Sequence, residues 1–254
     1  MSIINEILYR PLFNALIFLY NTVALHDLGI AIVFLTIIIR VILWSSQAKA
    51  LRSQRDLQKL QPELEKIKTK YKDKQKQTQE TLAFYKKHKV SPFSSCLPTL
   101  IQLPIIIALY QVFRNSLNAA SLSALYPFIS RPESVNSISL GIINLSQPNK
   151  IVLPIITGAL QFVQSWMLMK RIPAMKAGGQ KLDAASAVSR QMMYIFPLMT
   201  VFIAMSLPAA LPIYWIVTTL FAIIQQWYIM RDDKSGYDGK ISKRGVKVRV
   251  RKRQ

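Results

Sequence analysis

The charged residues of this chain are missing from several long stretches, and this segregation constrains its fold more than any other feature. A helix needs about 20 apolar residues to cross about 30 Å of hydrocarbon, at about 1.5 Å per residue. Long uncharged runs therefore predict membrane-spanning helices, and they exclude a soluble nucleic-acid-binding protein in spite of the net charge of +21. The uncharged runs that bear on possible spans are residues 11–25, 28–39, 41–48, 90–113, 151–169 and 191–230.

Five segments reach the length of a span. Residues 28–48 qualify if Arg40 is accepted inside the membrane, and the long run 191–230 divides into two helices at Pro208 and Pro212. The expected fold class is therefore an all-α polytopic membrane protein with five transmembrane helices. The expected spans are 28–48, 93–117, 151–169, 191–207 and 208–230, joined by a cytoplasmic helical hairpin (49–92), an outer loop (118–150) and a cytoplasmic loop (170–190), with a basic cytoplasmic tail (231–254).

The first 27 residues are expected to form an amphipathic helix at the outer face. Glu6, Arg10, Asn14 and Asn21 share one helical face, whereas the apolar side chains lie off it. Such a pattern is typical of a helix that lies in the membrane interface. The alternative is a sixth span, because the uncharged run 11–25 is only slightly too short.

The loop charges predict the orientation. Residues 45–92, 170–190 and 231–254 hold 13, 5 and 10 of the 33 Lys and Arg residues, and five spans place all three segments on one side. The positive-inside rule makes that side the cytoplasm. The N-terminus is then expected outside, with the hairpin and the C-terminus inside.

The hairpin 49–92 carries a heptad-like apolar stripe. Leu57, Leu60, Leu64, Ile67 and Tyr71 are spaced by three and four residues, and Leu82 and Tyr85 continue the stripe in the second helix. This predicts two antiparallel helices, with Pro62 interrupting the first or opening its second part. The hairpin is then either a docking arm or a solvated connector.

Arg40 is the one charged residue in the interior of the predicted spans, since Arg114 lies close to the end of the span 93–117. An arginine in the middle of a span costs about 2.5–3.5 kcal/mol and normally faces a wet cavity or a partner. No acidic residue is present in the other spans, but they contain the amides Gln102, Gln161 and Gln164, and Thr36 lies one turn before Arg40. This pattern favours a water-accessible groove centred on Arg40. Alternatively, the side chain extends to the cytoplasmic interface near Lys49.

The sequence does not favour an enzyme. His26 and His88 are expected on opposite sides of the membrane, no carboxylate pair lies at membrane depth, and no phosphate-binding Gly-rich loop is present. No cofactor or metal site is expected. The single cysteine, Cys96, is interpreted as a small packing residue.

Several motifs resemble the YidC/Oxa/Alb family of membrane protein insertases. Residues 29–40 (GIAIVFLTIIIR) are similar to the family's first core span, and residues 60–63 (LQPE) to its hairpin. The most specific match is residues 89–110 (KVSPFSSCLPTLIQLPIIIALY). Residues 207–215 (LPAALPIYW) and 224–226 (IQQ) resemble the last span pair, so the match extends over roughly residues 10–230.

The resemblance implies five core helices, a cytoplasmic hairpin and a groove that is closed to the outside but open to cytoplasm and lipid. Arg40 matches the groove arginine, and Thr36, Gln164 and Trp215 match other groove positions. Leu100, Leu103 and Ile203 match positions that contact a passing substrate helix. The implied function is insertion and folding of membrane proteins, alone or with the Sec translocon and without ATP.

The resemblance also implies a location and partners. The large outer domain of Gram-negative members and the lipoprotein signal of many Gram-positive members are absent from this sequence, which suggests a compact bacterial form in the plasma membrane. Hydrophobic segments of nascent or released membrane proteins are the expected substrates. The tail 240–254 alternates basic and apolar residues, which suits either ribosomal RNA or anionic lipids. A small-solute or ion transporter is the alternative function, since it would use the same polar groove.

Overall fold

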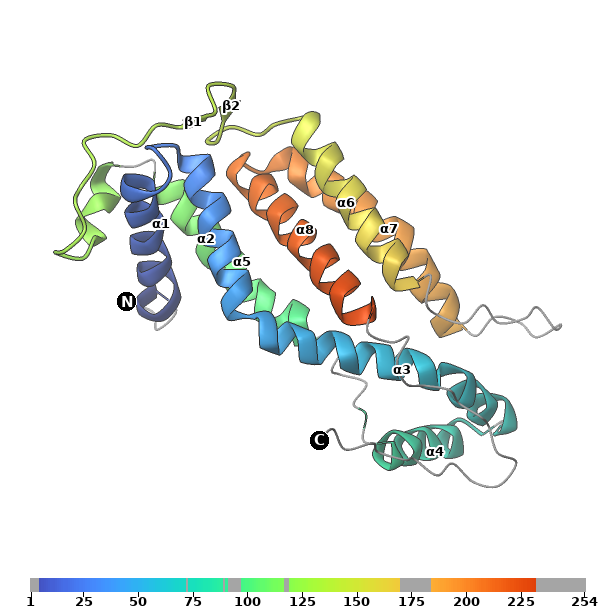
Figure 1. Cartoon of the computed structure of the whole chain (residues 1–254). Helices are drawn as coiled ribbons and strands as arrows, with labels where there is room; N and C mark the ends of the chain where they lie inside the picture. Colours follow the sequence, from blue (N-terminus) through green and yellow to red (C-terminus); the bar gives the residue numbers. More distant parts are fainter. Residues whose placement is uncertain are drawn as a thin grey trace.

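The computed structural model describes residues 5–71, 73–88, 90, 97–116, 119–169 and 184–231, and this part of the chain is almost entirely helical (Figure 1). The expected all-α class is therefore confirmed, with a short β-hairpin added on the outer loop. The elements in chain order are η1 (Asn5–Tyr9), α1 (Arg10–Thr22), α2 (Leu28–Ile42), α3 (Trp44–Lys70), α4 (Lys74–Lys87), α5 (Leu97–Ser116), η3 (Ala119–Ala124), β1 (Ile138–Ser139), β2 (Ile143–Asn144), α6 (Val152–Met169), α7 (Ala184–Ser206) and α8 (Ala210–Arg231).

Two of the described helical segments, Val152–Met169 and Ala210–Ile229, are long and apolar enough to cross a membrane. The bent pair α2–α3 is a third candidate, and Met193–Ser206 of α7 forms a shorter apolar helix. By this measure the described residues contain two or three spans, so the expected number of five stays a prediction. Helix α7 begins at Ala184, before the predicted start of a span at residue 191.

The first predicted span, 28–48, differs from the structure because it is not one straight helix. Helix α2 ends at Ile42, and the chain bends by 63° into α3, which begins at Trp44. Gln47 lies beyond this bend on α3. The straight part of the span therefore has 15 residues.

Contacts with α8 hold this bend. The Trp44 ring lies 5.6 Å from the ring of Phe221 and 6.3 Å from that of Tyr228. Gln225, which is fully buried, donates a hydrogen bond from Nε2 to the Trp44 carbonyl at 3.0 Å. Because α8 is far from this segment in the sequence, the pattern of uncharged residues could not predict where α2 ends.

The helices form a layered bundle in which α8 is central. Helix α8 packs against α2 on one side and α6 on the other, and α6 also packs against α7. Helix α5 contacts α1 and α8, behind α2 in the view of Figure 1. Fully buried side chains from α1, α2, α5 and α8 form one apolar core, which includes Phe13, Leu16, Ile17, Leu28, Ile32, Leu109, Val112, Leu211 and Tyr214.

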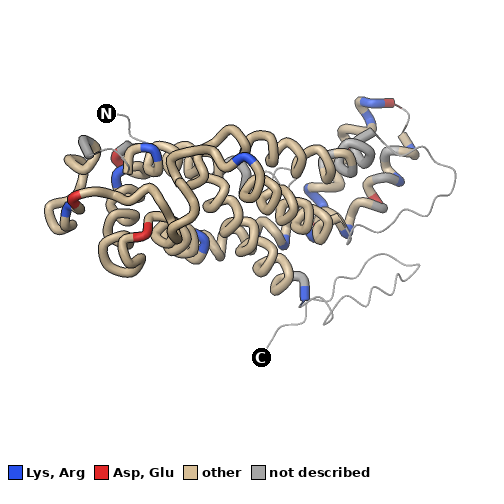
Figure 2. The backbone as a smooth tube through the Cα atoms, turned by 90° about the horizontal axis from the view of Figure 1, so that it is seen from above, with Lys and Arg blue, Asp and Glu red and all other residues tan. Residues whose placement is uncertain are grey.

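The outer loop ties the helix ends together. Strands β1 and β2 pair antiparallel, and the loop continues to the turn between α7 and α8, where Ala209 donates a backbone hydrogen bond to the Gln147 carbonyl at 2.9 Å. Charged residues are sparse on the bundle helices and frequent on the arm formed by α3 and α4 (Figure 2).

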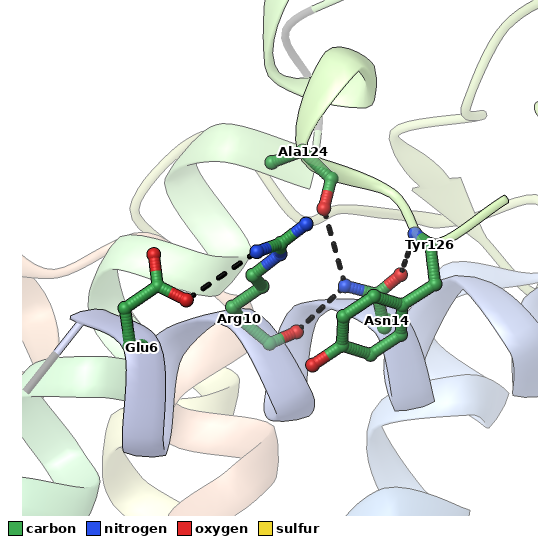
Figure 3. Close-up of polar contacts among 5 residues, drawn as sticks. All are labelled: Glu6, Arg10, Asn14, Ala124 and Tyr126. Carbon is green, nitrogen blue, oxygen red and sulfur yellow. Dashed lines mark hydrogen bonds and ion pairs between the residues drawn. The ribbon is translucent and has the colours of Figure 1, made fainter.

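Helix α1 has a different setting from the one expected for residues 1–27. It stands beside α2 in the bundle (Figure 1), and it packs against α2 and α5. Its polar face is partly covered by the outer loop, while the Glu6 side chain stays exposed. Asn14 is 2% exposed, donates to the carbonyls of Arg10 and Ala124 and accepts from the Tyr126 backbone N–H (Figure 3).

Arg10 completes this polar cluster between α1 and the outer loop. Its Nη1 lies 3.3 Å from Glu6 Oε2, and its guanidinium lies 5.0 Å from the centre of the Tyr126 ring. Farther along α1, Asn21 donates to the Ser130 carbonyl at 2.7 Å. Three of the four residues on the polar face, Arg10, Asn14 and Asn21, therefore contact the outer loop, whereas Ile7 and Phe18 are exposed.

The predicted hairpin forms as α3 and α4, which pack against each other. Helix α3 continues through position 62, where an interruption was predicted. Leu64 is the most deeply buried member of the apolar stripe at 3% exposed. Leu82 was expected to continue the stripe, but it is 53% exposed, so that detail is wrong.

Candidate functional site

Arg40 is the centre of a polar cluster that joins three helices. Its side chain is 5% exposed, and Nη2 donates to Gln102 Oε1 of α5 at 2.8 Å. The other end of the Gln102 amide hydrogen-bonds through Nε2 to the hydroxyl of Tyr214, a buried residue of α8. The guanidinium is held between α2, α5 and α8, which favours the groove over the alternative in which Arg40 extends to the interface.

The cluster explains how a charge is tolerated inside an apolar bundle. A buried guanidinium that loses water needs acceptors, and a hydrogen bond to a charged group contributes about 1.5–3 kcal/mol. Gln102 provides one such acceptor, while Arg40 Nε is buried without a partner among the described residues. The arginine is therefore anchored at one nitrogen and retains a free donor.

Helix α8 carries further buried polar groups. Thr218 Oγ1, Gln225 Oε1 and Gln226 Nε2 are buried and have no hydrogen-bond partner within the described part of the chain. Thr218 lies one turn after Tyr214, and Gln225 lies two turns after Thr218. The three side chains therefore share one face of α8. The polar character at Arg40 therefore continues along α8 toward Trp44.

The other predicted groove residues lie on the same bundle but are not all brought together. Thr36 is 1% exposed and donates to its own helix, at the Ile32 carbonyl at 2.6 Å. Gln164 on α6 and Trp215 on α8 are partly buried, and Trp215 packs against the core. Of the predicted set, the structure joins Arg40 directly to Gln102.

The predicted substrate-contact residues have exposed side chains where they are described. Leu103 of α5 is 52% exposed and Ile203 of α7 is 43% exposed. Leu100 lies in α5, and its side chain is outside the described residues, as are Cys96 and the tail 232–254. Exposed apolar side chains on these two helices provide a surface for lipid or for another apolar helix.

Tyr214 was missed as a site residue in the sequence. It was noted only as part of the aromatic motif 207–215, next to Trp215, which was selected instead. The signal was available, because a tyrosine inside an apolar span usually finds a hydrogen-bond partner for its hydroxyl.

A second polar cluster lies at the outer end of α2. Asp27 caps this helix by accepting from the Ile30 N–H at 3.0 Å, and it also accepts from Ser139 Oγ and the Leu140 N–H, each at 2.6 Å. A Cβ atom at Gly29 would clash with the Ser139 side chain, so the hairpin approaches α2 closely there. Partial burial raises the pKa of Asp27, but the hydrogen bonds from Leu140, Ser139 and Ile30 outweigh it and hold the pKa below its ordinary value.

Comparison with known proteins gives the family. Residues 18–236 match the family model described as 60Kd inner membrane protein. The chain is 37% identical over 229 residues to "Membrane protein insertase YidC" of Fusobacterium nucleatum, a match that covers 88% of this chain and 97% of that protein. The chain belongs to the YidC/Oxa1 family. This confirms the resemblance seen in the motifs.

Other relatives of this family agree. The chain is 34% identical over 211 residues to "Membrane protein insertase MisCA" of Bacillus subtilis, covering 81% of this chain and 71% of the relative. A crystal structure titled "Active YidC insertase crystal structure with the first transmembrane domain resolved" matches with a TM-score of 0.57 at 26% identity. That match covers 90% of this chain and 47% of the solved one, so this chain spans about half the length of the solved chain.

Proposed function

We propose that this chain is a membrane protein insertase that uses the Arg40 cluster to help polar segments of its substrates enter the membrane. Membership of the YidC/Oxa1 family supports insertion as the activity. The observation that carries the site is the part-buried hydrogen bond from Arg40 to Gln102, at 2.8 Å, within a largely apolar bundle.

The proposed topology has five spans, formed by α2, α5, α6, α7 and α8. In this topology the outer ends of the spans are the ends next to the β1–β2 loop. The α3–α4 arm and the C-terminus lie in the bacterial cytoplasm. The excess of Lys and Arg in 45–92, 170–190 and 231–254 supports this orientation.

The proposed mechanism begins when the polar tail of a substrate reaches a groove beside Arg40 from the cytoplasm. An acidic group about 4 Å from the guanidinium would gain about 4 kcal/mol at an effective dielectric constant of about 20. Arg40 Nε supports this role, because it is a buried donor without a partner within the described residues. Thr36, Gln164 and Trp215 would line the same groove.

The apolar part of the substrate would then move along α5 and α7. The exposed side chains of Leu103 and Ile203 support this path, and Leu100 is proposed as a third contact. Transfer of the substrate helix into lipid contributes about 25 cal/mol per Å² of apolar surface, so the process needs no ATP.

The proposed partners follow from the charge pattern. The basic tail 240–254 would bind ribosomal RNA, with anionic lipid headgroups as the competing ligand, and the α3–α4 arm would receive substrates or dock the Sec translocon. Removal of residues 240–254 should reduce salt-sensitive co-sedimentation with ribosomes. Unchanged co-sedimentation would contradict the ribosome assignment and favour lipid.

Reconstitution of the purified chain into vesicles tests the function. A single-span substrate with an acidic tail should become protected from protease by the wild type, and the Arg40→Ala variant should protect much less of it. The same vesicles should not transport small ions or solutes. Robust solute flux without any protected substrate would overturn the insertase and favour a transporter.

A further inference from the structure

The outer end of the bundle presents apolar side chains on two turns with unusual backbone geometry. Leu25 (φ 53°) and Leu140 (φ 52°) both adopt the left-handed conformation, which is unfavourable for a bulky residue. Both side chains are exposed, at 87% and 66%, and Ile142 beside them is 81% exposed. The unfavourable backbone conformation therefore does not serve to bury these leucines within the protein. Their outward position suggests a contact with something outside the protein.

Asp27 joins the two turns to each other. It follows Leu25 by two residues, and its carboxylate accepts hydrogen bonds from the Leu140 N–H and from Ser139 Oγ, each at 2.6 Å. The β1–β2 hairpin and the connection between α1 and α2 consequently lie at the same end of the bundle (Figure 1). Leu25, Leu140 and Ile142 are therefore exposed apolar side chains on two turns at this end of the bundle, and we call these three residues the outer patch.

The length of α2 places the outer patch at the membrane. Its 15 residues measure about 22 Å, whereas the hydrocarbon layer is about 30 Å thick. The missing length does not continue straight at the other end, because the chain turns by 63° into α3. The turns that carry the outer patch adjoin Leu28, so at the outer end of α2 they lie at the level where hydrocarbon gives way to headgroups.

The composition of the loop agrees with a lipid environment. Residues 134–149 contain no charged side chain, and Glu133 and Lys150 flank this segment. Uncharged loops with exposed Leu and Ile suit the boundary between headgroups and acyl chains, where apolar side chains enter the lipid and Ser and Asn contact the headgroups.

We propose that Leu25, Leu140 and Ile142 insert into the outer leaflet of the lipid bilayer and anchor the closed end of the bundle there. Asp27 is a positioning residue for this contact, because it holds both turns with their leucines outward. The inference rests on the five-span topology proposed above, in which α2 crosses the membrane with Leu28 at its outer end.

Fluorescence quenching in vesicles tests the inference. An environment-sensitive dye is attached to Leu140→Cys in a Cys96→Ser background, in vesicles of phosphatidylcholine and phosphatidylglycerol that contain lipids with a doxyl quencher near the headgroup. Ser134→Cys, an exposed polar position on the same loop, is the matched control. Dye at position 140 should be quenched at least about twofold more than dye at 134, and should emit at shorter wavelength.

Two results would overturn the inference. Equal quenching at positions 140 and 134 with water-like emission would place the hairpin in water. A blue-shifted emission at 140 that the doxyl lipids do not quench would assign the outer patch to a protein partner instead.

A third labelling site separates this failure from a failure of the topology. Val163→Cys on α6, 40% exposed, should be quenched by lipids with the doxyl group near the middle of the acyl chain. Loss of that signal would contradict the span itself. Quenching at 163 with insertion activity, but without quenching at 140, would reject the lipid contact alone.

Discussion

Substitution of Gln102 separates the positioning of Arg40 from its charge. Gln102→Leu removes the acceptor at 2.8 Å and leaves a guanidinium that is 5% exposed without that partner. A hydrogen bond to a charged group contributes about 1.5–3 kcal/mol, and the stranded donor adds to the loss. This variant should therefore have a lower melting temperature and insert all substrates poorly.

Gln102→Glu should have the opposite profile. The carboxylate can accept from Arg40 in the same geometry and also from the Tyr214 hydroxyl, so the attraction offsets much of its desolvation penalty and stability should stay close to that of the wild type. However, the permanent ion pair cancels the charge offered to substrates. The attraction between Arg40 and an acidic substrate tail should then be largely lost. At about 4 Å this attraction is about 4 kcal/mol, which corresponds to about three orders of magnitude in a binding constant.

The assay compares two substrates that differ only in the tail, which carries either aspartates or asparagines. The wild type should insert the acidic tail preferentially into vesicles, and Gln102→Glu should remove this preference while retaining insertion of the asparagine tail. Gln111→Glu, at an exposed position near the outer end of α5, adds the same charge away from Arg40 and should behave like the wild type. An unchanged preference for acidic tails in Gln102→Glu would refute the electrostatic role of Arg40.

Three other sites give testable expectations. Because the pKa of Asp27 is depressed in the folded state, its contribution to stability is present above the ordinary Asp pKa of about 3.9 and is lost as the pH falls through the lower folded value. Asp27→Ala should therefore flatten the acid side of a stability–pH curve and, as the loss of a helix cap, destabilise by about 0.5–2 kcal/mol; an unaltered curve would contradict the assignment. A Cβ at Gly158 of α6 would clash with Val201 of α7, so Gly158→Ala should lower stability by about 1–3 kcal/mol in thermal unfolding, unless that valine can move aside. Gln225→Leu removes the hydrogen bond to the Trp44 carbonyl, and spin labels on α3 and α8 should report a broader distance distribution; a distribution as narrow as that of the wild type would show that the aromatic contacts alone hold the bend.

The uncharged runs predicted most helices of the bundle because a span must satisfy its backbone internally, and this requirement leaves a strong composition signal. The same signal did not predict the end of α2. Residues 41–48 continue the uncharged run past Ile42, and the bend there is held by Phe221, Gln225 and Tyr228 of α8. Such contacts between distant segments are invisible in local composition.

The candidate site could also be predicted only in part, because composition does not show which distant residues come into contact. Arg40 is conspicuous because a charge in a span is expensive, and Gln102 was noted as a polar residue at membrane depth. Gln102 bonds to both Arg40 and Tyr214, and this arrangement depends on how α2, α5 and α8 pack. Likewise, the polar face of α1 indicated an amphipathic helix, but Asn14 and Asn21 bind loop carbonyls instead of facing headgroups.

Site-specific photo-crosslinking during synthesis of a membrane protein tests the central claim most directly. A photoreactive residue at position 103 or 203, where the native side chains are 52% and 43% exposed, should crosslink to the nascent apolar segment. The same probe at position 18 on α1, where Phe18 is 51% exposed, should not. Equal crosslinking at all three positions, or crosslinking at position 18 alone, would contradict a substrate path along α5 and α7.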